Sequence, residues 1–258
     1  MEWNFDPVII RVGPMALRWY SLMFMLAFLG GYVIMRWIYN KEKKDADRVD
    51  QLFVFMFFST IIGARLGHCL FYNPVYYLSN PLEILMIWKG GLASHGAAVG
   101  ILTGLYIYSK KNPDLKYLWI VDRIVIVVAL SGFFIRMGNL FNSEIVGITT
   151  DVPWAFIFTK IDMLPRHPAQ LYEAIAYLFI FGLLIAIYKK NTVKLEGGYL
   201  LGLFFLCVFG FRFFVEFFKE NQAVFEKGWT LNMGQILSIP LVLIGIFLIV
   251  RAKTKPVR

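Results

Sequence analysis

The feature that most constrains the fold of this chain is a series of seven apolar segments, each long enough to cross a lipid bilayer as a helix. A transmembrane helix needs about 20 mostly apolar residues to cross about 30 Å of hydrocarbon. The segments lie near residues 15–38, 50–72, 92–109, 117–137, 169–188, 198–218 and 232–250. The sequence therefore predicts one polytopic, all-α integral membrane domain over residues 1–258, with about seven transmembrane helices.

Composition agrees with a membrane protein and argues against a nucleic-acid binder. Hydrophobic residues make up 59% of the chain and charged residues only 17%, whereas charged residues are about a quarter of a soluble domain. The formal net charge is +9, but the basic residues stand between apolar segments rather than on one solvated face. We therefore expect the lipid bilayer as a partner and no nucleic acid.

The distribution of basic residues predicts the orientation. Fifteen Lys and Arg residues follow the first, third, fifth and seventh segments, and seven lie on the opposite side. The larger group occupies residues 36–48, 110–116, 189–194 and 251–258. Because cytoplasmic loops carry an excess of Lys and Arg, the N-terminus is expected outside and the C-terminus in the cytoplasm.

The connections on the outer side differ in character from the short, basic inner ones. Residues 73–91 and 138–168 form longer loops that are rich in Pro, Gly, Asn and aromatic residues. Long loops held by a rigid scaffold often carry function. The outer face is therefore where we expect the working site.

Glycines recur at helical spacing within several segments. They are Gly63 with Gly67, Gly96 with Gly100 and Gly104, and Gly198 with Gly202. Small residues let membrane helices pack closely, so we interpret these glycines as packing positions without a chemical role.

Four arginines lie within the apolar segments: Arg65, Arg123, Arg136 and Arg212. A charge at the centre of the bilayer costs at least about 2.5 kcal/mol unless it is paired or hydrated, so each arginine needs an explanation. Arg123 follows Asp122 near the inner end of its segment, and an ion pair or snorkelling to the interface accounts for it.

We interpret Arg136 and Arg212 as functional. Arg136 leads into a turn with two asparagines and Glu144, which suits a polar headgroup, although snorkelling at the helix end is an alternative. Arg212 precedes Glu216 by one helical turn, so a structural ion pair remains a serious alternative for it. Both arginines are expected in the outer half of the membrane, where two guanidinium groups can clamp one phosphate.

His95 is a candidate proton acceptor among the three histidines. It stands beside Gly96 at the outer start of the third segment, where an imidazole can take a proton near neutral pH. A hydrogen-bonded structural histidine is an equally common alternative. His68 and His167 are interpreted as structural.

The sequence suggests neither a metal nor a cofactor. Cys69 and Cys207 each lie inside an apolar segment and are interpreted as buried apolar residues. There is no HExxH, CxxC, P-loop or GxGxxG pattern. The candidate site thus consists of arginines, amides and a histidine, a set that suits anionic headgroups and proton transfer.

Several ordered motifs together resemble one known family. The strongest is Arg-Met-Gly-Asn-Leu-Phe-Asn-Ser-Glu-Ile-Val-Gly at residues 136–147. Others occur, in family order, at residues 18–20, 63–67, 71–73, 90–96, 167–173, 212–218 and 233–238. Over nearly the whole chain these motifs resemble the prolipoprotein diacylglyceryl transferase family.

The resemblance implies a reaction and a location. Members transfer the diacylglyceryl group of phosphatidylglycerol to the lipobox cysteine of a preprolipoprotein, forming a thioether and releasing glycerol phosphate. No cofactor is implied. The expected location is the bacterial cytoplasmic (inner) membrane, with the active site toward the outer, periplasmic side.

The resemblance also implies residue roles. The catalytic residues would be His95 as the base for the thiol, Tyr20 as a polar contact, and the two arginines Arg136 and Arg212. The phosphatidylglycerol site would comprise Arg136, Asn139, Glu144, Gly147, Arg212 and Glu216. The chain departs from the family pattern at Ser94, Ile135, Val208 and Lys219.

A transporter or channel for an anionic lipid or solute is the alternative from another class, because intramembrane arginines also mark anion pathways. Many transporters contain inverted repeats with broken helices near the bilayer midplane. The sequence shows no such repeat, and its unusual residues gather at one face. The enzyme is therefore the favoured interpretation.

Overall fold

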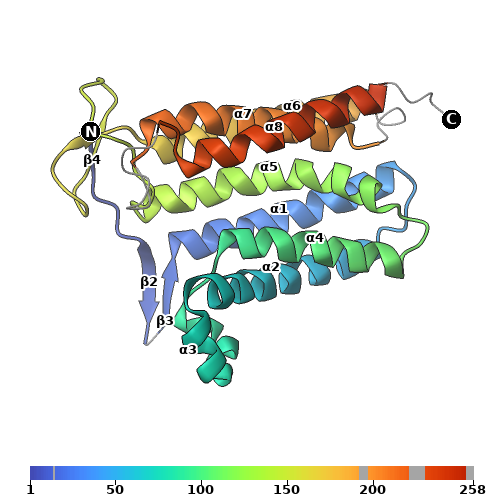
Figure 1. The fold of residues 1–258 in the computed structure, drawn as a ribbon, viewed down its shortest axis with the longest axis horizontal. Coiled ribbons are helices and arrows are strands. Elements are labelled where there is room, and N and C mark those ends of the chain that lie inside the picture. Colours follow the sequence, from blue (N-terminus) through green and yellow to red (C-terminus); the bar gives the residue numbers. More distant parts are fainter. Residues whose placement is uncertain (14, 192–196, 221–229, 254–258) are drawn as a thin grey trace. The chain divides into compact units, whose positions relative to one another are not determined.

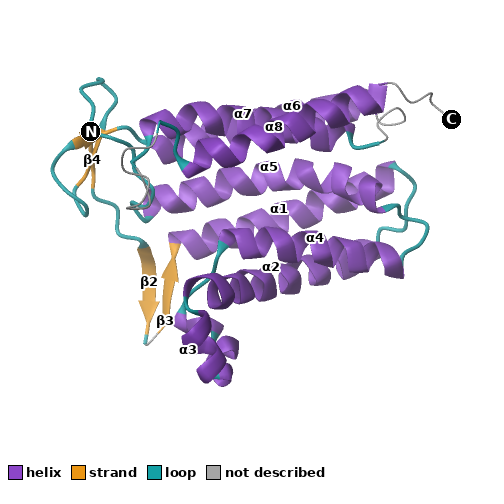
Figure 2. Cartoon of the chain, in the orientation of Figure 1, coloured by secondary structure: helices purple, strands orange, loops and turns teal. Residues whose placement is uncertain are grey.

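The computed structural model describes residues 1–13, 15–191, 197–220 and 230–253, and it is mostly helical (Figures 1 and 2). Six of the helices within these ranges are long and apolar enough to cross a membrane. They are α1 (Trp19–Lys41), α2 (Arg48–Tyr72), α5 (Tyr117–Phe141), α6 (Ala169–Asn191), α7 (Tyr199–Val215) and α8 (Met233–Lys253). The chain is therefore a multi-pass membrane protein.

The predicted third span does form a helix, α4 (Ser94–Lys111), but it is not among these six. It has 18 residues, with His95 at one end and Lys110 and Lys111 at the other, which lowers its apolar content. A count of seven spans is thus not confirmed, and the orientation stays a prediction. Four of the basic residues counted for the orientation lie outside the described residues: Lys194, Lys227, Lys255 and Arg258.

Two element boundaries differ from those expected. Residues 15–18 were predicted to open the first span, but Met15–Arg18 is strand β3, paired antiparallel with β2 (Val8–Val12). Helix α5 continues to Phe141, so the loop expected from residue 138 starts later. The helix ends where Ser143, with a φ of 56°, enters the left-handed region, which breaks the helical hydrogen bonding. Contrary to the expectation of a loop, residues 138–141 are therefore helical.

The predicted loop at residues 73–91 also has structure of its own. It contains the short helix α3 (Pro74–Ser79) and two 3₁₀ helices, η1 (Pro81–Leu85) and η2 (Ile87–Lys89). None of the three elements has a buried residue. The segment is therefore held by something other than an apolar core of its own.

The described chain divides into two compact units, and each is considered by itself. The smaller unit comprises residues 36–121. In it α2 and α4 pack antiparallel through the predicted glycines, because a Cβ added at Gly63 would lie 2.7 Å from the Cα of Gly100. One added at Gly67 would lie 2.6 Å from the Cα of Gly96. The packing role expected for these glycines is confirmed.

The larger unit comprises residues 1–35 and 122–258 within the described ranges, and α7 lies between α6 and α8 in contact with both (Figure 1). Asp122 of α5 holds the N-terminus of α7. The two carboxylate oxygens of Asp122 accept hydrogen bonds from the backbone N–H groups of Gly198 and Leu201, at 2.8 and 2.9 Å. A carboxylate there satisfies N–H groups that a helix start leaves unpaired, so it sets the position of α7 along its axis.

A small cap of strands covers the end of the larger unit where α5 ends and α6 begins. β1 (Glu2–Trp3) pairs in parallel with β4 (Phe156–Phe158), and β4 pairs antiparallel with β5 (Pro165–Arg166). The indole of Trp3 stacks on Phe156 and donates a 3.0 Å hydrogen bond to the carbonyl of Leu140. The cap therefore ties the end of α5 to the segment that leads into α6.

The close contact of α2 and α4 predicts a specific sensitivity to a single methyl group. Gly63→Ala should destabilise the protein by about 1–3 kcal/mol, because its Cβ would press on the α4 backbone. Gly182→Ala on α6, where the new Cβ would meet nothing within 4 Å, should be neutral or stabilising by up to about 1 kcal/mol. Unfolding by SDS titration in mixed micelles measures both, and equal midpoints would contradict the glycine contact.

Candidate active site

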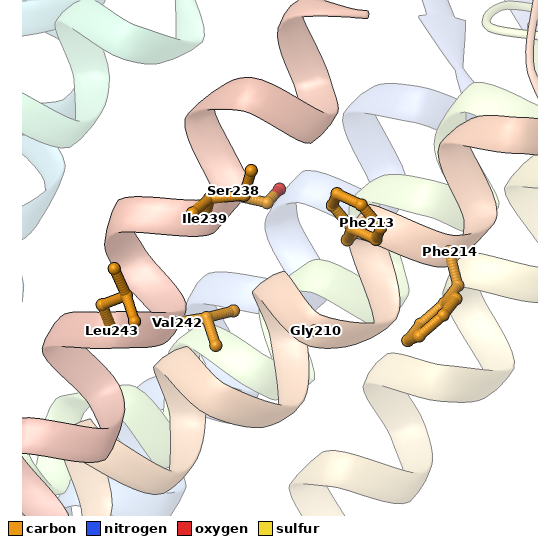
Figure 3. Close-up of a pocket in the computed structure, with 7 residues that line it drawn as sticks. All are labelled: Gly210, Phe213, Phe214, Ser238, Ile239, Val242 and Leu243. Carbon is orange, nitrogen blue, oxygen red and sulfur yellow. The ribbon is translucent and has the colours of Figure 1, made fainter. Parts of the chain in front are cut away.

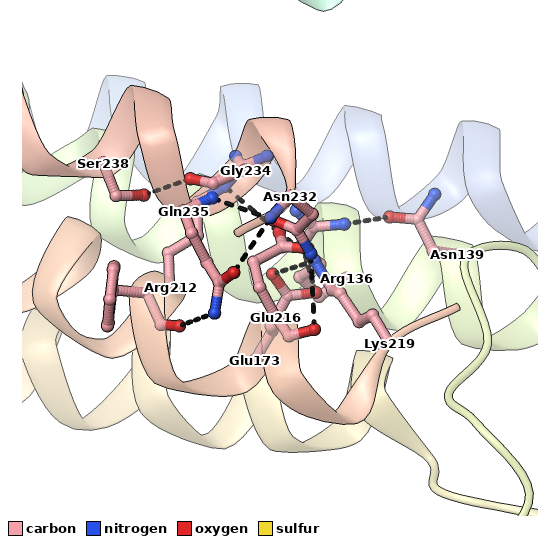
Figure 4. A network of polar contacts seen from close by, with 11 residues as sticks. Arg136, Asn139, Glu173, Arg212, Glu216, Lys219, Asn232, Gly234, Gln235 and Ser238 are labelled. Atoms are coloured by element: carbon pink, nitrogen blue, oxygen red, sulfur yellow. Dashed lines mark hydrogen bonds and ion pairs between the residues drawn. The ribbon is translucent and has the colours of Figure 1, made fainter. Parts of the chain in front are cut away.

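A connected set of charged side chains crosses the larger unit where α5, α6, α7 and η3 (Glu216–Phe218) come together (Figure 4). Its members are Arg136 of α5, Glu173 of α6, Arg212 of α7, Glu216 of η3 and Lys219 directly after it. We call this set the ion network. It is built from residues far apart in the sequence, so only the packing of the helices assembles it.

Arg136 forms one end of the ion network. Its Nε lies 3.1 Å from Oε2 of Glu173, and its side chain is 13% exposed. Nη1 donates to Oδ1 of Asn139 at 3.4 Å, one turn along α5, and Nδ2 of Asn139 donates to Oε2 of Glu144 at 3.0 Å. The guanidinium is thereby joined to the turn that follows α5.

Arg212 forms the other end. Its Nε lies 3.4 Å from Oε1 of Glu216, so the ion pair considered from the sequence is present. The Arg212 side chain is nevertheless 37% exposed, whereas that of Glu216 is 7% exposed. A buried carboxylate therefore orients a guanidinium whose far end stays accessible.

Lys219 joins the two halves of the ion network. Its Nζ donates to Oε1 of Glu216 at 2.9 Å and to Oε1 of Glu173 at 3.0 Å, and its side chain is 1% exposed. The two buried carboxylates therefore share one ammonium as an ion-pair partner. Three cations and two anions leave the ion network with one net positive charge.

The two arginines retain unused hydrogen-bond donors. Among the described residues, Nη2 of Arg136 and both Nη groups of Arg212 have no hydrogen-bond partner. Tyr177 of α6, which is partly buried, interacts electrostatically with both arginines and with Glu173. The N–H groups left free are those that bind phosphate oxygens well, because a guanidinium presents them in a fork.

Tyr20 joins the Arg136 end of the site. Its ring packs against Gly138, where an added Cβ would lie 2.8 Å from Cδ2 of the tyrosine. The phenol also interacts electrostatically with Glu144 and Arg136. The structure thus brings together the expected residues Tyr20, Arg136, Asn139 and Glu144.

Gly147, expected to shape the headgroup site, has a packing reason for being glycine. An added Cβ would lie 2.5 Å from the carbonyl oxygen of His167 and 2.6 Å from that of Phe218. Its N–H donates to His167 O at 3.0 Å and its carbonyl accepts from Nη1 of Arg166 at 3.1 Å. Both backbone groups are engaged, and the missing side chain of Gly147 lets the backbone at His167 and at Phe218 approach it closely.

His167 lies beside this contact and is structural in character, as expected. Its Nδ1 is 3.1 Å from the hydroxyl of Tyr172, and its ring packs edge-on against Phe218. Burial lowers the pKa of His167 below its usual value, which favours the neutral imidazole.

The start of α8 supports Glu216. A Cβ at Gly234 would lie 2.6 Å from Oε1 of Glu216, and Nδ2 of Asn232 donates to its Oε2 at 3.3 Å. Asn232 and Gln235 exchange hydrogen bonds in which each side-chain oxygen accepts from the other residue's backbone N–H, at 2.9 and 3.0 Å. This reciprocal cap fixes the start of α8 against the ion network.

An apolar pocket opens between α7 and α8 (Figure 3). Its volume is about 270 Å³. The lining residues are Gly210, Phe213, Phe214, Ser238, Ile239, Val242 and Leu243. An apolar cavity of this kind suits the hydrocarbon part of a ligand.

His95 belongs to the smaller unit. Its exposed ring packs edge-on against Phe71 at 5.2 Å between centroids and lies 5.9 Å from Tyr72. Neither ring nitrogen has a hydrogen-bond partner among the described residues.

The comparisons with known proteins show the family of this chain. Residues 7–251 match the family model described as prolipoprotein diacylglyceryl transferase. The chain belongs to the prolipoprotein diacylglyceryl transferase family.

Relatives named phosphatidylglycerol–prolipoprotein diacylglyceryl transferase match nearly end to end. The one from Chloroherpeton thalassium is 50% identical over 247 residues, which cover 96% of this chain and 92% of the relative. That from Tolumonas auensis is 47% identical, with 98% of each chain covered. That from Bacteroides fragilis is 44% identical, with 96% of this chain and 93% of the relative covered.

Four polar residues of this family member's site were not predicted as site residues: Glu173, Lys219, Asn232 and Gln235. Glu173 and Gln235 fall inside segments that carried the family resemblance, but neither had an evident partner in sequence. Lys219 was treated only as a loop residue at a departure from the family pattern. Its spacing of three residues from Glu216, at the end of an apolar segment, was the available signal.

The central position of Lys219 predicts a large stability loss on its removal. Lys219→Gln should destabilise the protein by about 3–5 kcal/mol, because two buried carboxylates lose their shared cation. Lys89→Gln, which removes an ion pair whose lysine side chain is 51% exposed, should cost less than about 1 kcal/mol. The same SDS titration measures the stability of both variants. A similarly small loss of stability in each would show that Lys219 does not stabilise the fold through Glu173 and Glu216.

Proposed function

We propose that this chain transfers the diacylglyceryl group of phosphatidylglycerol to the lipobox cysteine of a preprolipoprotein and releases glycerol phosphate. Membership of the family and the names of the relatives support this reaction. The structural observation that carries it is a pair of arginines with unused donors, held in an ion network of net positive charge. Such a site matches a phosphodiester headgroup.

The reaction replaces one bond by another at a single carbon. The cysteine sulfur attacks the glycerol carbon that bears the phosphate, a C–S bond forms, and the C–O bond to phosphate breaks. The leaving phosphate gains negative charge as the bond breaks, because a diester monoanion becomes a monoester. Arg136 and Arg212 stabilise that growing charge through their free N–H groups, and their orientation is set before the substrate binds.

Polar groups around Arg136 recognise the rest of the headgroup. The terminal glycerol of phosphatidylglycerol carries two hydroxyl groups, which can donate to a carboxylate and accept from an amide. Glu144 and Asn139 present such groups, and Tyr20 adds a phenol on the same side of α5. Glu216 serves the site by holding Arg212, and the apolar pocket between α7 and α8 accommodates acyl-chain carbons.

The proposed location is the bacterial inner membrane, with the site toward the periplasmic side. The excess of basic residues in the connections at the opposite ends of the helices supports this orientation. A preprolipoprotein presents its lipobox cysteine next to an apolar signal segment, so acceptor and donor are both anchored in the bilayer. Reaction at the membrane surface then needs no soluble carrier.

Arg136 is expected to be needed for the reaction. With phosphatidylglycerol and a lipobox peptide in detergent, the wild type should add a diacylglyceryl mass to the peptide cysteine. Arg136→Ala should lower the rate by about 10²–10³-fold, because a preorganised donor to the leaving group is lost. Arg11→Ala, on the exposed strand β2, is the matched control and should retain the wild-type rate.

Mass spectrometry of the peptide reads both rates. A folded wild type without any mass gain would overturn the proposed reaction, and solute or lipid flux in liposomes would then test the transporter alternative. An Arg136→Ala variant with full activity would instead leave the proposed reaction standing and show that Arg136 does not contribute to catalysis.

His95 is expected to act as the base that takes the proton of the cysteine thiol. His95→Asn keeps a similar size but cannot accept a proton near neutral pH, so turnover should fall by about 10²-fold or more. The rate is measured by the mass of the peptide product, and unchanged turnover would show that His95 does not take the thiol proton.

A further inference from the structure

Arg65 is a buried cation that forms no ion pair with any described carboxylate. It lies on α2, is 3% exposed, and its guanidinium donates only to backbone carbonyls. Nε donates to Ile84 O at 2.9 Å, and Nη2 donates to Glu83 O at 2.5 Å. Nη1 donates to Gly90 O at 2.6 Å and to Gly91 O at 3.2 Å.

These four acceptors lie at the two ends of one segment. Glu83 and Ile84 belong to η1, and Gly90 and Gly91 follow η2, so a single guanidinium closes residues 83–91 into a loop. The segment has no buried side chain of its own. The hydrogen bonds from Arg65 therefore attach this segment to α2. The guanidinium also lies 5.1 Å from the ring centre of Tyr77 in α3.

Gly91 shows how closely the loop is fitted to this cation. Its φ of 73° lies in the left-handed region, where a side chain is strained. An added Cβ would also lie 2.9 Å from Nη1 of Arg65 and 2.6 Å from the ring of His68. Only glycine fits between these two side chains.

The same attachment leads directly into the turn of helix that bears His95. Two residues after Gly91, the N–H of Ala93 donates to the carbonyl of Ala64 at 2.9 Å, next to Arg65 on α2. Helix α4 starts at the following residue, and the His95 ring packs on Phe71 of α2. The position of the imidazole therefore depends on how residues 90–93 are held against α2.

We propose that Arg65 is a positioning residue for His95, acting through the backbone of residues 90–93 and without touching substrate. This inference rests on the proposed function, because it assigns Arg65 to the step in which His95 takes the thiol proton. A single carboxylate could neutralise Arg65 equally well, but it would attach only one point of the loop to α2. The four carbonyls come from both ends of residues 83–91, so their hydrogen bonds to Arg65 fix the course of the loop backbone.

The test separates turnover from lipid binding. Arg65→Gln removes the charge and most of the donors, and we expect kcat to fall at least tenfold while the KM for phosphatidylglycerol stays within twofold. That binding site is built from the other unit, and the ion network is untouched. Arg65→Lys keeps the charge but not the fork, so its kcat should lie between those of Arg65→Gln and the wild type. Arg48→Gln, at the far end of the same helix and in an exposed pair with Asp114, is the matched control and should keep both constants.

Gly91→Ala provides a second, independent variant, because it disturbs the same loop while Arg65 remains. It should show the same selective loss of kcat, and it decides the question if the Arg65 variants do not fold. Full kcat in Arg65→Gln, full kcat in Gly91→Ala, or a change confined to the KM for phosphatidylglycerol would overturn the positioning role. An inactive but folded wild type would instead overturn the proposed function itself.

Discussion

The site depends on one buried ammonium group, that of Lys219, placed between Glu173 and Glu216. Without a cation there, two buried carboxylates would lose the ion-pair partner between them, which is costly in apolar surroundings. With it, each carboxylate also pairs with one arginine, Arg136 or Arg212. Two guanidinium groups that would repel each other are thereby kept in one site. Their free N–H groups remain available for an anionic ligand.

The rest of the larger unit positions the elements that carry these charges. Helix α7 is fixed at its start by the Asp122 carboxylate and at its end by the contact of Glu216 with the beginning of α8. The cap of strands fixes the end of α5 through Trp3, and the absent side chain of Gly147 lets three backbone segments approach one another. Each is a local contact, and together they leave little freedom for the arginines to move apart.

Much of the site was predictable because a charge in an apolar segment is expensive and so demands a reason. That argument led to Arg136 and Arg212, the polar turn after Arg136 pointed to Asn139 and Glu144, and the resemblance added Tyr20. The fold brings Tyr20, Asn139 and Glu144 together at one end of α5. The same reasoning did not extend to Lys219, because a lysine at the end of a span is normally solvated at the interface. The carboxylates that bury it come from other elements, one of them 46 residues away along the chain.

The sequence by itself determined that this chain crosses a membrane several times, because apolar runs of that length have no other stable environment. It also determined the family and the charged residues that need partners. The tertiary structure alone decided which partner each charge takes, that α4 is a shorter and less apolar helix packed on α2, and that Arg65 binds carbonyls and no carboxylate. Ion pairs and hydrogen bonds form or fail within a few tenths of an ångström, and such distances between remote residues arise only when the helices pack.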